Sequence, residues 1–294
     1  MLELILFPAL LGVGFAVDYI ASENDKDDED EPLLVTLDEG TAEFVGTEAK
    51  EHVTGNALDN HVEGGEGNDL IGGLEGADTL DGGAGEDRLF GGAGDDVAQG
   101  GTGDDKIFLG DGADRLIYAD GSDAGDDFIR GGDHGDTLID TRGSNQIHGD
   151  LGADLISTVD GLGPDGSIAT PEKAGSADTI HAGFGNDTLI GDSGDLMTGG
   201  EGEDSFIVAT ALQNEDAPAV LADFDLRDDM LSVVFLGKPP ADPTISFSFD
   251  EESGLIYASV EGQNIATISG LEDWDIPFIT TFTTTLPELL ATAA

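Results

Sequence analysis

One large apolar side chain recurs every nine residues through the middle of the chain. The clearest units are five consecutive nonapeptides in residues 64–108, namely GGEGNDLIG, GLEGADTLD, GGAGEDRLF, GGAGDDVAQ and GGTGDDKIF. The apolar residue stands at position 8, positions 1, 2 and 4 favour glycine, and position 6 is aspartate. A period of nine is too short for a helical repeat. The pattern predicts a six-residue turn and a three-residue strand in every unit.

A single inward side chain per strand leaves a thin core shared by two layers of strands. Two units then make one coil of 18 residues, and the predicted fold is an all-β parallel β-roll. Turns that are two units apart lie above one another on the same edge. We therefore expect Asp69 to stack near Asp87 and Asp78 near Asp96, so that odd and even turns form separate columns.

The period continues with interruptions as far as residue 207. Four extra residues, 118–121, and a 15-residue insertion, 158–172, separate runs of units, and the unit 191–198 is one residue short, which puts Asp195 out of phase. Asn145 replaces the position-6 aspartate, and His134 and Ser176 replace position-4 glycines. Residues 46–54 and 55–63 keep the apolar position but lose most glycines, which is typical of a cap. The predicted β-roll spans residues 46–207.

The segments on either side of the roll have other patterns. Residues 208–294 alternate apolar and polar side chains over several stretches, which predicts a β-rich C-terminal cap. Residues 1–21 form a hydrophobic N-terminal segment, and residues 22–45 form an acidic linker that leads into the roll. The apolar run, residues 4–17, is short for a membrane span and lacks the basic region of a secretory signal, so membrane association, a packed helix and a degenerate signal stay open.

Composition excludes several classes of partner. The chain has 63 Asp and Glu against 10 Lys and Arg, a formal net charge of -53, and no cysteine. Nucleic acid is excluded as a partner because its binding depends on Lys and Arg displacing counterions from phosphates. Without cysteine there is no disulfide framework, thiolate zinc site or thiol catalysis.

Columns of stacked aspartates need a cation between them. Carboxylates about 4.8 Å apart repel one another. Carboxylate oxygens and the carbonyls of glycine-rich turns suit Ca²⁺ better than Mg²⁺, and zinc lacks its usual Cys and His ligands here. The sequence thus predicts several Ca²⁺ ions, with the position-6 aspartates as candidate ligands: Asp69, Asp78, Asp87, Asp96, Asp105, Asp114, Asp127, Asp136, Asp154, Asp178, Asp187 and Asp204.

The motif G-G-x-G-x-D-x-U-x resembles that of the RTX, or hemolysin-type, calcium-binding repeat proteins. The resemblance implies a Ca²⁺-filled β-roll, export through a type I secretion system that recognises a C-terminal signal, and folding after exit. It also implies that turn glycines contribute carbonyl ligands, which here are Gly65, Gly67, Gly83, Gly85, Gly92, Gly94, Gly101 and Gly103. The stretch after residue 205 resembles the C-terminal region that closes the roll in serralysin-type proteins, and residues 278–294 are consistent with the export signal.

Ca²⁺ binding is expected to drive folding of the repeat region. Without metal the glycine-rich, self-repelling repeats have too little core to fold, so binding free energy becomes folding free energy. At a free Ca²⁺ concentration ten times the dissociation constant, each site contributes about 1.4 kcal/mol. Cytosolic Ca²⁺ is too scarce to fill such sites. The chain is therefore expected to stay unfolded in the cytosol and to fold in the extracellular space.

No catalytic residue and no organic cofactor are predicted. The chain has no H-E-x-x-H motif, all five histidines fall in repeat units, and Ser193 in a GDSG segment occupies an ordinary turn position. We therefore expect a non-enzymatic, secreted or cell-surface Ca²⁺-binding protein with a structural or adhesive role, whose partners are the secretion machinery and cell-surface or matrix components. The alternative hypothesis is the targeting module of an enzyme that acts on extracellular polymers.

Overall fold

The fold was analysed in a computed structural model, which describes residues 32–117, 125–160, 176–211, 217–236, 243–271 and 281–284. The hydrophobic N-terminal segment, residues 22–31 of the acidic linker, most of the 158–172 insertion and most of the expected export signal lie outside these residues. No helix of the described part is long and apolar enough to cross a membrane.

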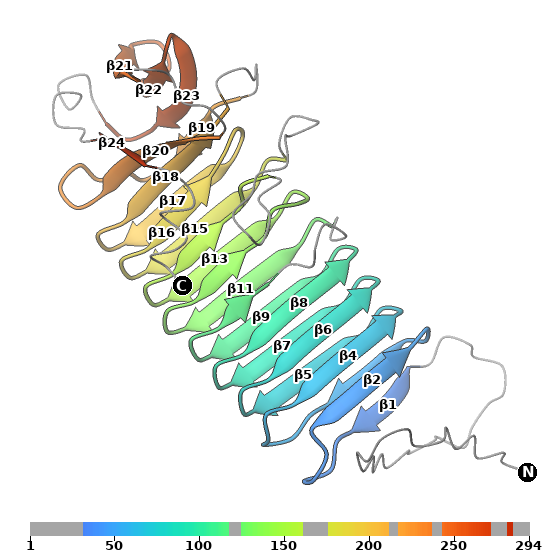
Figure 1. Ribbon diagram of the computed structural model, residues 1–294. Coiled ribbons are helices and arrows are strands. Elements are labelled where there is room, and N and C mark those ends of the chain that lie inside the picture. The colour runs from blue at the N-terminus through green and yellow to red at the C-terminus, as the bar shows by residue number, and fades with distance from the viewer. Residues whose placement is uncertain are drawn as a thin grey trace, which may run out of the picture.

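All regular structure in the described residues is β-strand, and the strands form two sheets that wind along one axis (Figure 1). The first sheet has 13 strands in the order β1 (Leu33–Thr36), β3 (Glu51–Thr54), β5 (Leu70–Glu75), β7 (Arg88–Ala93), β9 (Lys106–Asp111), β11 (Phe128–Asp133), β13 (Gln146–Leu151), β15 (Thr179–Phe184), β17 (Leu196–Glu201), β19 (Ala219–Leu221), β23 (Gln263–Ile268), β22 (Leu255–Val260) and β21 (Ile245–Asp250). The second sheet has 11 strands in the order β2 (Glu43–Thr47), β4 (His61–Glu66), β6 (Thr79–Ala84), β8 (Val97–Thr102), β10 (Arg115–Leu116), β12 (Thr137–Ile139), β14 (Leu155–Ser157), β16 (Thr188–Gly191), β18 (Ser205–Thr210), β20 (Met230–Phe235) and β24 (Thr281–Thr284).

From β1 to β20, successive strands alternate between the two sheets, and each pairs in parallel with the strand two places along the chain. In β7 and β9, for example, Leu89 lies opposite Ile107 and Phe90 opposite Phe108, a register of 18 residues. The predicted all-β parallel β-roll is therefore confirmed, with one coil for every two nonapeptides.

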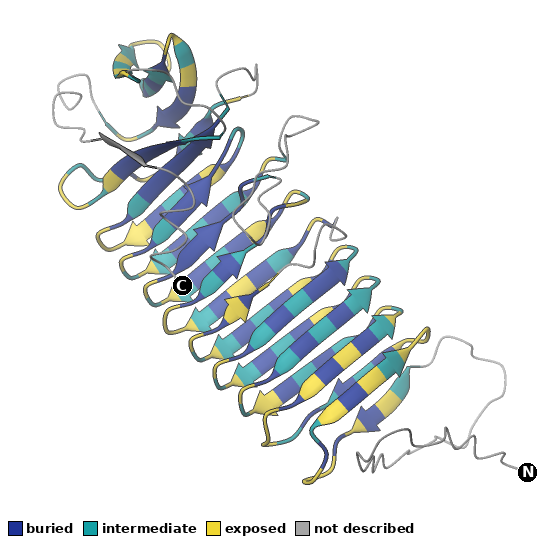
Figure 2. Ribbon diagram, viewed as in Figure 1, coloured by how far each residue is buried: buried dark blue, intermediate teal, exposed yellow. Residues whose placement is uncertain are grey.

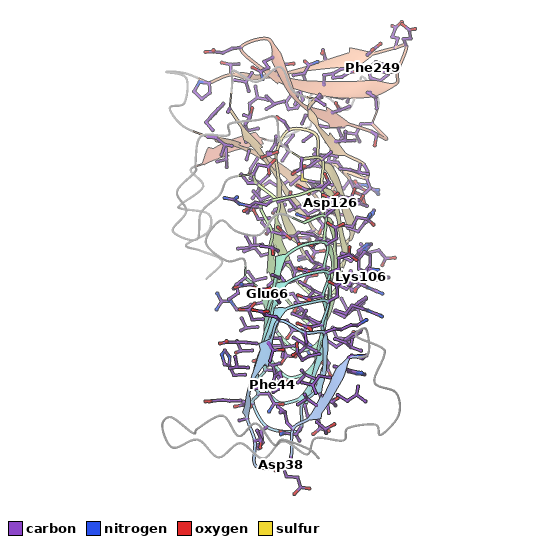
Figure 3. All side chains as sticks on the ribbon, turned by 90° about the vertical axis from the view of Figure 1, so that its right-hand side faces the viewer. Asp38, Phe44, Glu66, Lys106, Asp126 and Phe249 are labelled. Atoms are coloured by element: carbon purple, nitrogen blue, oxygen red, sulfur yellow. The ribbon has the colours of Figure 1, made fainter. Side chains whose placement is uncertain are left out.

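The core consists of two columns of position-8 side chains, one from each sheet, that pack against each other between the sheets. Leu80, Leu89 and Ile107 are at most 1% exposed, and the small Ala98 belongs to one of these columns. Along most strands of the roll, buried residues alternate with half-buried or exposed ones (Figure 2), and the side view shows side chains filling the narrow space between the sheets (Figure 3). The core is thin, because each unit contributes one inward side chain.

The residues after 207 are rich in strands and continue the same two sheets. β19 and β20 pair in parallel with β17 and β18. β23, β22 and β21 then form an antiparallel meander that ends the first sheet (Figure 1). This end of the molecule contains larger apolar side chains, including Phe206, Phe224 and Ile256, which are all at most 3% exposed.

Candidate metal centre

Two rows of position-6 side chains run along the roll. In each row, one side-chain oxygen accepts the backbone N–H of the equivalent residue one coil earlier, as Asp87 Oδ1 does from Asp69 N at 2.7 Å. The first row, beside the first sheet, contains Glu51, Asp69, Asp87, Asp105, Asp127, Asn145, Asp178 and Asp195. The second row contains Asn60, Asp78, Asp96, Asp114, Asp136, Asp154, Asp187, Asp204 and Asp229. The expected stacking of Asp69 with Asp87 and of Asp78 with Asp96 is confirmed.

Insertions and deletions in the sequence do not interrupt the rows. The spacing along the first row is 22 residues between Asp105 and Asp127, 33 between Asn145 and Asp178, and 17 between Asp178 and Asp195. The second row shows the same three spacings at the corresponding coils. The prediction that Asp195 is out of phase is therefore wrong, because the missing residue is absorbed in the turn before it.

The second carboxylate oxygen of most row aspartates is buried without a hydrogen-bond partner. Every aspartate in the predicted ligand set is at most 3% exposed. Among the described residues, the buried Oδ2 atoms of eight of them have no partner: Asp69, Asp78, Asp87, Asp96, Asp114, Asp136, Asp154 and Asp187. An unpaired buried carboxylate is costly unless a cation compensates it or it takes up a proton.

Burial raises the carboxyl pKa values along both rows. Desolvation raises the pKa of Asp87 to about 6, that of Asp96 to about 7 and that of Asp136 to about 8. Repulsion from the next carboxylates in the row adds to each increase. In the first row, burial and the neighbouring Asp195 raise the pKa of Asp178 to about 9. The rows thus favour either bound protons or bound cations.

Main-chain carbonyls supply further oxygens beside the aspartates. Gly83 and Gly85 have φ of 104° and 143°, and a Cβ on either would collide with the carbonyl oxygen of the equivalent glycine, Gly65 or Gly67, one coil earlier. The carbonyls at positions 2 and 4 therefore point along the roll axis toward the next turn. All eight glycines predicted as ligands, Gly65, Gly67, Gly83, Gly85, Gly92, Gly94, Gly101 and Gly103, have positive φ.

The position-1 glycines show how closely carboxylate and carbonyl oxygens approach. A Cβ on Gly82 would lie 2.5 Å from both Asp87 Oδ2 and the carbonyl oxygen of Gly100. A side chain has no room at this point, where two oxygens converge. Together with the unpartnered Oδ2 atoms, this all-oxygen environment fits a hard cation such as Ca²⁺.

Side chains alone would not form a metal site. Within the described ranges, no group of three or more His, Asp or Glu side chains could hold a metal ion. Each site would need one or two carboxylates together with backbone carbonyls. Described histidines lie outside the rows: His134 pairs with Asp111 at 3.1 Å, and His148 stacks on His181 with ring centroids 5.1 Å apart.

Five row residues were not predicted as ligands, and four of them have side chains that the protein itself satisfies. Asn60, Asn145, Asp195 and Asp229 make hydrogen bonds within the protein through both polar side-chain atoms. Asn145 Nδ2, for example, donates to the carbonyl of Arg142 at 2.9 Å. Asp229 lies 25 residues beyond Asp204, outside the nonapeptide period, so the period could not identify it.

A comparison with protein families agrees with the repeat geometry. The family of the RTX calcium-binding nonapeptide repeat (4 copies) matches residues 54–89, 90–124, 123–139, 130–161 and 174–206. None of the curated protein sequences matches the chain. Among solved structures, the extracellular lipase LipA from Serratia marcescens is similar, with 16% sequence identity and a TM-score of 0.23, over 80% of this chain and 40% of the lipase chain.

The chain thus spans less than half the length of that lipase. The matched repeats cover the two rows of aspartates from Asp69 to Asp204. Residues 54–161 and 174–206 are RTX calcium-binding nonapeptide repeats, and the chain is an RTX repeat protein.

Proposed function

We propose that this protein binds several Ca²⁺ ions between the turns of its β-roll and folds when it meets extracellular Ca²⁺. The observation that carries the proposal is the set of buried Oδ2 atoms without a partner among the described residues, which recur from coil to coil between Asp69 and Asp187. The proposed ligands are the twelve position-6 aspartates from Asp69 to Asp204 and the turn carbonyls of Gly65, Gly67, Gly83, Gly85, Gly92, Gly94, Gly101 and Gly103.

Ca²⁺ is favoured over other cations by the chemistry of the turns. Ca²⁺ accepts six to eight oxygens in irregular geometry, whereas Mg²⁺ requires a near-ideal octahedron and retains its waters. The turns offer carboxylate and carbonyl oxygens from neighbouring coils. No row position carries a side-chain nitrogen that could bind a metal, because the row residues are Asp, Glu and Asn. A bound divalent ion would remove the repulsion between stacked carboxylates such as Asp136 and Asp154.

Binding and folding would be coupled because the core is thin. Each coil buries two large side chains, so hydrophobic burial in the repeats is small relative to the chain entropy lost. Ca²⁺ binds the assembled rows and not the unfolded chain, so its binding free energy adds to the folding free energy. Extracellular Ca²⁺ concentrations suit sites with dissociation constants of about 10⁻⁴ to 10⁻³ M.

We further propose a non-enzymatic, structural or adhesive role outside the cell, after export by a type I secretion system. In this organisation residues 46–207 form the Ca²⁺-dependent roll and residues 208–294 form the cap with the secretion signal. Residues 1–21 would be an apolar segment, and residues 22–45 would be an acidic linker and the entry to the roll, where β1 lies. The family match of the repeats supports this proposal, and a structural or adhesive partner would be a cell-surface or matrix component.

Calorimetric titration of the chelator-treated chain with Ca²⁺, followed in parallel by far-UV circular dichroism, tests the proposed function. We expect several ions per chain and a cooperative gain of β structure, because both rows assemble together. Mg²⁺ at the same concentrations is the control and should produce much less of either change. Absence of Ca²⁺ binding, or binding without a gain of β structure, would refute the proposal.

A further inference from the structure

The first row begins with a glutamate that the nonapeptide motif does not include. Glu51 occupies position 6 of residues 46–54, and its N–H donates to Asp69 Oδ1 at 2.7 Å, as in every later coil. The matched repeats begin at residue 54, so Glu51 lies before them. The residue after Glu51, His52 in β3, pairs with the residue after Asp69, Leu70 in β5, so the two carboxylates hold equivalent places in successive coils.

Glu51 is a buried carboxylate with one oxygen left unsatisfied. The residue is 0% exposed. Its Oε1 accepts a hydrogen bond from Thr47 Oγ1 at 2.5 Å, whereas its buried Oε2 has no partner among the described residues. Burial raises the pKa of Glu51, and the nearby carboxylate of Asp69 raises it further. Two carboxylates therefore adjoin at this end of the row, and no cationic side chain of the described residues is bonded to either.

The same turn presents carbonyl oxygens in the positions used by the glycine turns. The carbonyl of Thr47 faces the Cα of Gly65, as that of Gly65 faces Gly83. The carbonyl oxygen of Ala49 would lie 2.6 Å from a Cβ on Gly67. The backbone of residues 46–51 thus continues the series of position-2 and position-4 carbonyls, although Gly46 is the one glycine in this segment.

The second row begins differently. Asn60 is neutral, its Oδ1 accepts from Asn56 N at 2.9 Å, and its Nδ2 donates to Asn56 Oδ1 at 3.2 Å. The C-terminal ends are closed in a similar way: Asp195 Oδ2 accepts from Asp192 N and Thr158 Oγ1, and Asp229 Oδ2 accepts from Asp225 N. Glu51 is the row end whose carboxylate retains an unsatisfied oxygen in the described structure.

We propose that Glu51 and Asp69, with the carbonyls of Thr47 and Ala49, hold an additional Ca²⁺ ion at the N-terminal end of the first row. The proposal rests on the proposed function, since it extends the same chemistry beyond the repeats. It makes the unit of residues 46–54 dependent on Ca²⁺, whereas the start of the second row at Asn60 is closed by protein hydrogen bonds.

Native mass spectrometry of the full chain tests this site, because it counts bound ions as integers. Glu51→Gln keeps the shape and the Oε1 acceptor but removes the charge. We expect it to bind one Ca²⁺ fewer than the wild type. The control is Glu48→Gln, the same substitution at an exposed position of the same turn, which should leave the count unchanged.

Hydrogen exchange of the wild type and both variants locates the effect. At a Ca²⁺ concentration ten times the dissociation constant, loss of one site should make opening of residues 47–54 about tenfold more frequent. An unchanged ion count in Glu51→Gln overturns the proposal while the wild type still binds several ions. A wild type that binds none refutes the proposed function itself. Should Glu51→Gln fail to fold, equal exchange of residues 47–54 in wild type with and without Ca²⁺ overturns the site.

Discussion

The position-6 side chain has two separate roles, one for each of its polar atoms. One oxygen joins adjacent coils by accepting an N–H from the coil before it, as Asp96 Oδ1 does from Asp78 at 2.7 Å. The other is available for a cation unless the protein supplies a donor. Asn145 retains the first role, with Oδ1 accepting from Asp127 N at 2.9 Å, but its amide nitrogen donates to the Arg142 carbonyl. The asparagine amide nitrogen thus takes the place of the second carboxylate oxygen, and its hydrogen bond takes the place of the cation that such an oxygen would bind.

We therefore predict that Asn145→Asp creates a further Ca²⁺ site. The aspartate keeps the bond to Asp127 N and presents a second oxygen to the carbonyl that the amide now contacts. Native mass spectrometry should show one more Ca²⁺ per chain. The control is Asn68→Asp, the same change at an exposed turn position whose Oδ1 accepts from Glu86 N, and it should add no ion. Equal counts in both variants would contradict this assignment of Asn145.

At the scale of the element, five neighbouring strands of the first sheet, β7, β9, β11, β13 and β15, each carry a ring on the outer face. Phe90, Phe108, Phe128, His148 and His181 follow one another along the roll with centroids 5.1 to 5.8 Å apart. Phe90 and Phe108 stack with an interplanar angle of 8°. Such cross-strand pairs stabilise adjacent strands beyond the burial of their area. The ladder links successive coils on the side that the thin core does not reach.

Phe108→Ala is expected to destabilise the Ca²⁺-loaded roll by about 1 to 3 kcal/mol, because it removes two ring pairs at about 0.5–1.5 kcal/mol each. Urea denaturation at saturating Ca²⁺ measures the change. The matched control is Gln146→Ala, an exposed residue on the outer face of β13, for which we expect a change within about 0.5 kcal/mol. Equal effects of the two substitutions would show that the ladder does not stabilise the roll.

At the scale of the whole molecule, the rows concentrate negative charge in the interior of a chain whose formal net charge is already -53. The ordinary aspartate pKa of 3.8 rises to about 6 in Asp87 and Asp154 and to about 8 in Asp136. Protons and Ca²⁺ are therefore alternative ways of neutralising the same oxygens. Binding of Ca²⁺ near neutral pH should release protons from the roll.

The metal-free chain should gain β structure as the pH falls. Because the folded pKa values lie above those of the unfolded chain, the folded form binds more protons between pH 4 and pH 8, and its stability decreases as pH rises through that range. Far-UV circular dichroism of chelator-treated protein from pH 8 to pH 5 should show β content appearing below about pH 6 to 7. With saturating Ca²⁺ the signal should change little. Loss of β structure on acidification of the metal-free chain would contradict this expectation.

The repeat pattern by itself determined the architecture of the roll. A nine-residue unit with one apolar position and glycines at positions 2 and 4 has one turn and one strand, and both are local features. The period therefore predicted the two-sheet roll, the stacking of Asp69 on Asp87, and the division of the aspartates into two rows. Glycines such as Gly83 were identifiable because their positive φ is a local requirement of the turn.

Only the tertiary structure decided which side chains belong to the rows and which of them stay unsatisfied. Membership depends on an N–H one coil away, so Asp195 and Asp229 joined the rows although the intervening loops changed the spacing to 17 and 25 residues. Whether an oxygen has a partner depends on nearby residues such as Asp192 or Arg142, which the motif does not specify. The unsatisfied Glu51 and the satisfied Asn60 were distinguishable for the same reason: hydrogen bonding of a buried group is set by its surroundings in space, not by its place in the repeat.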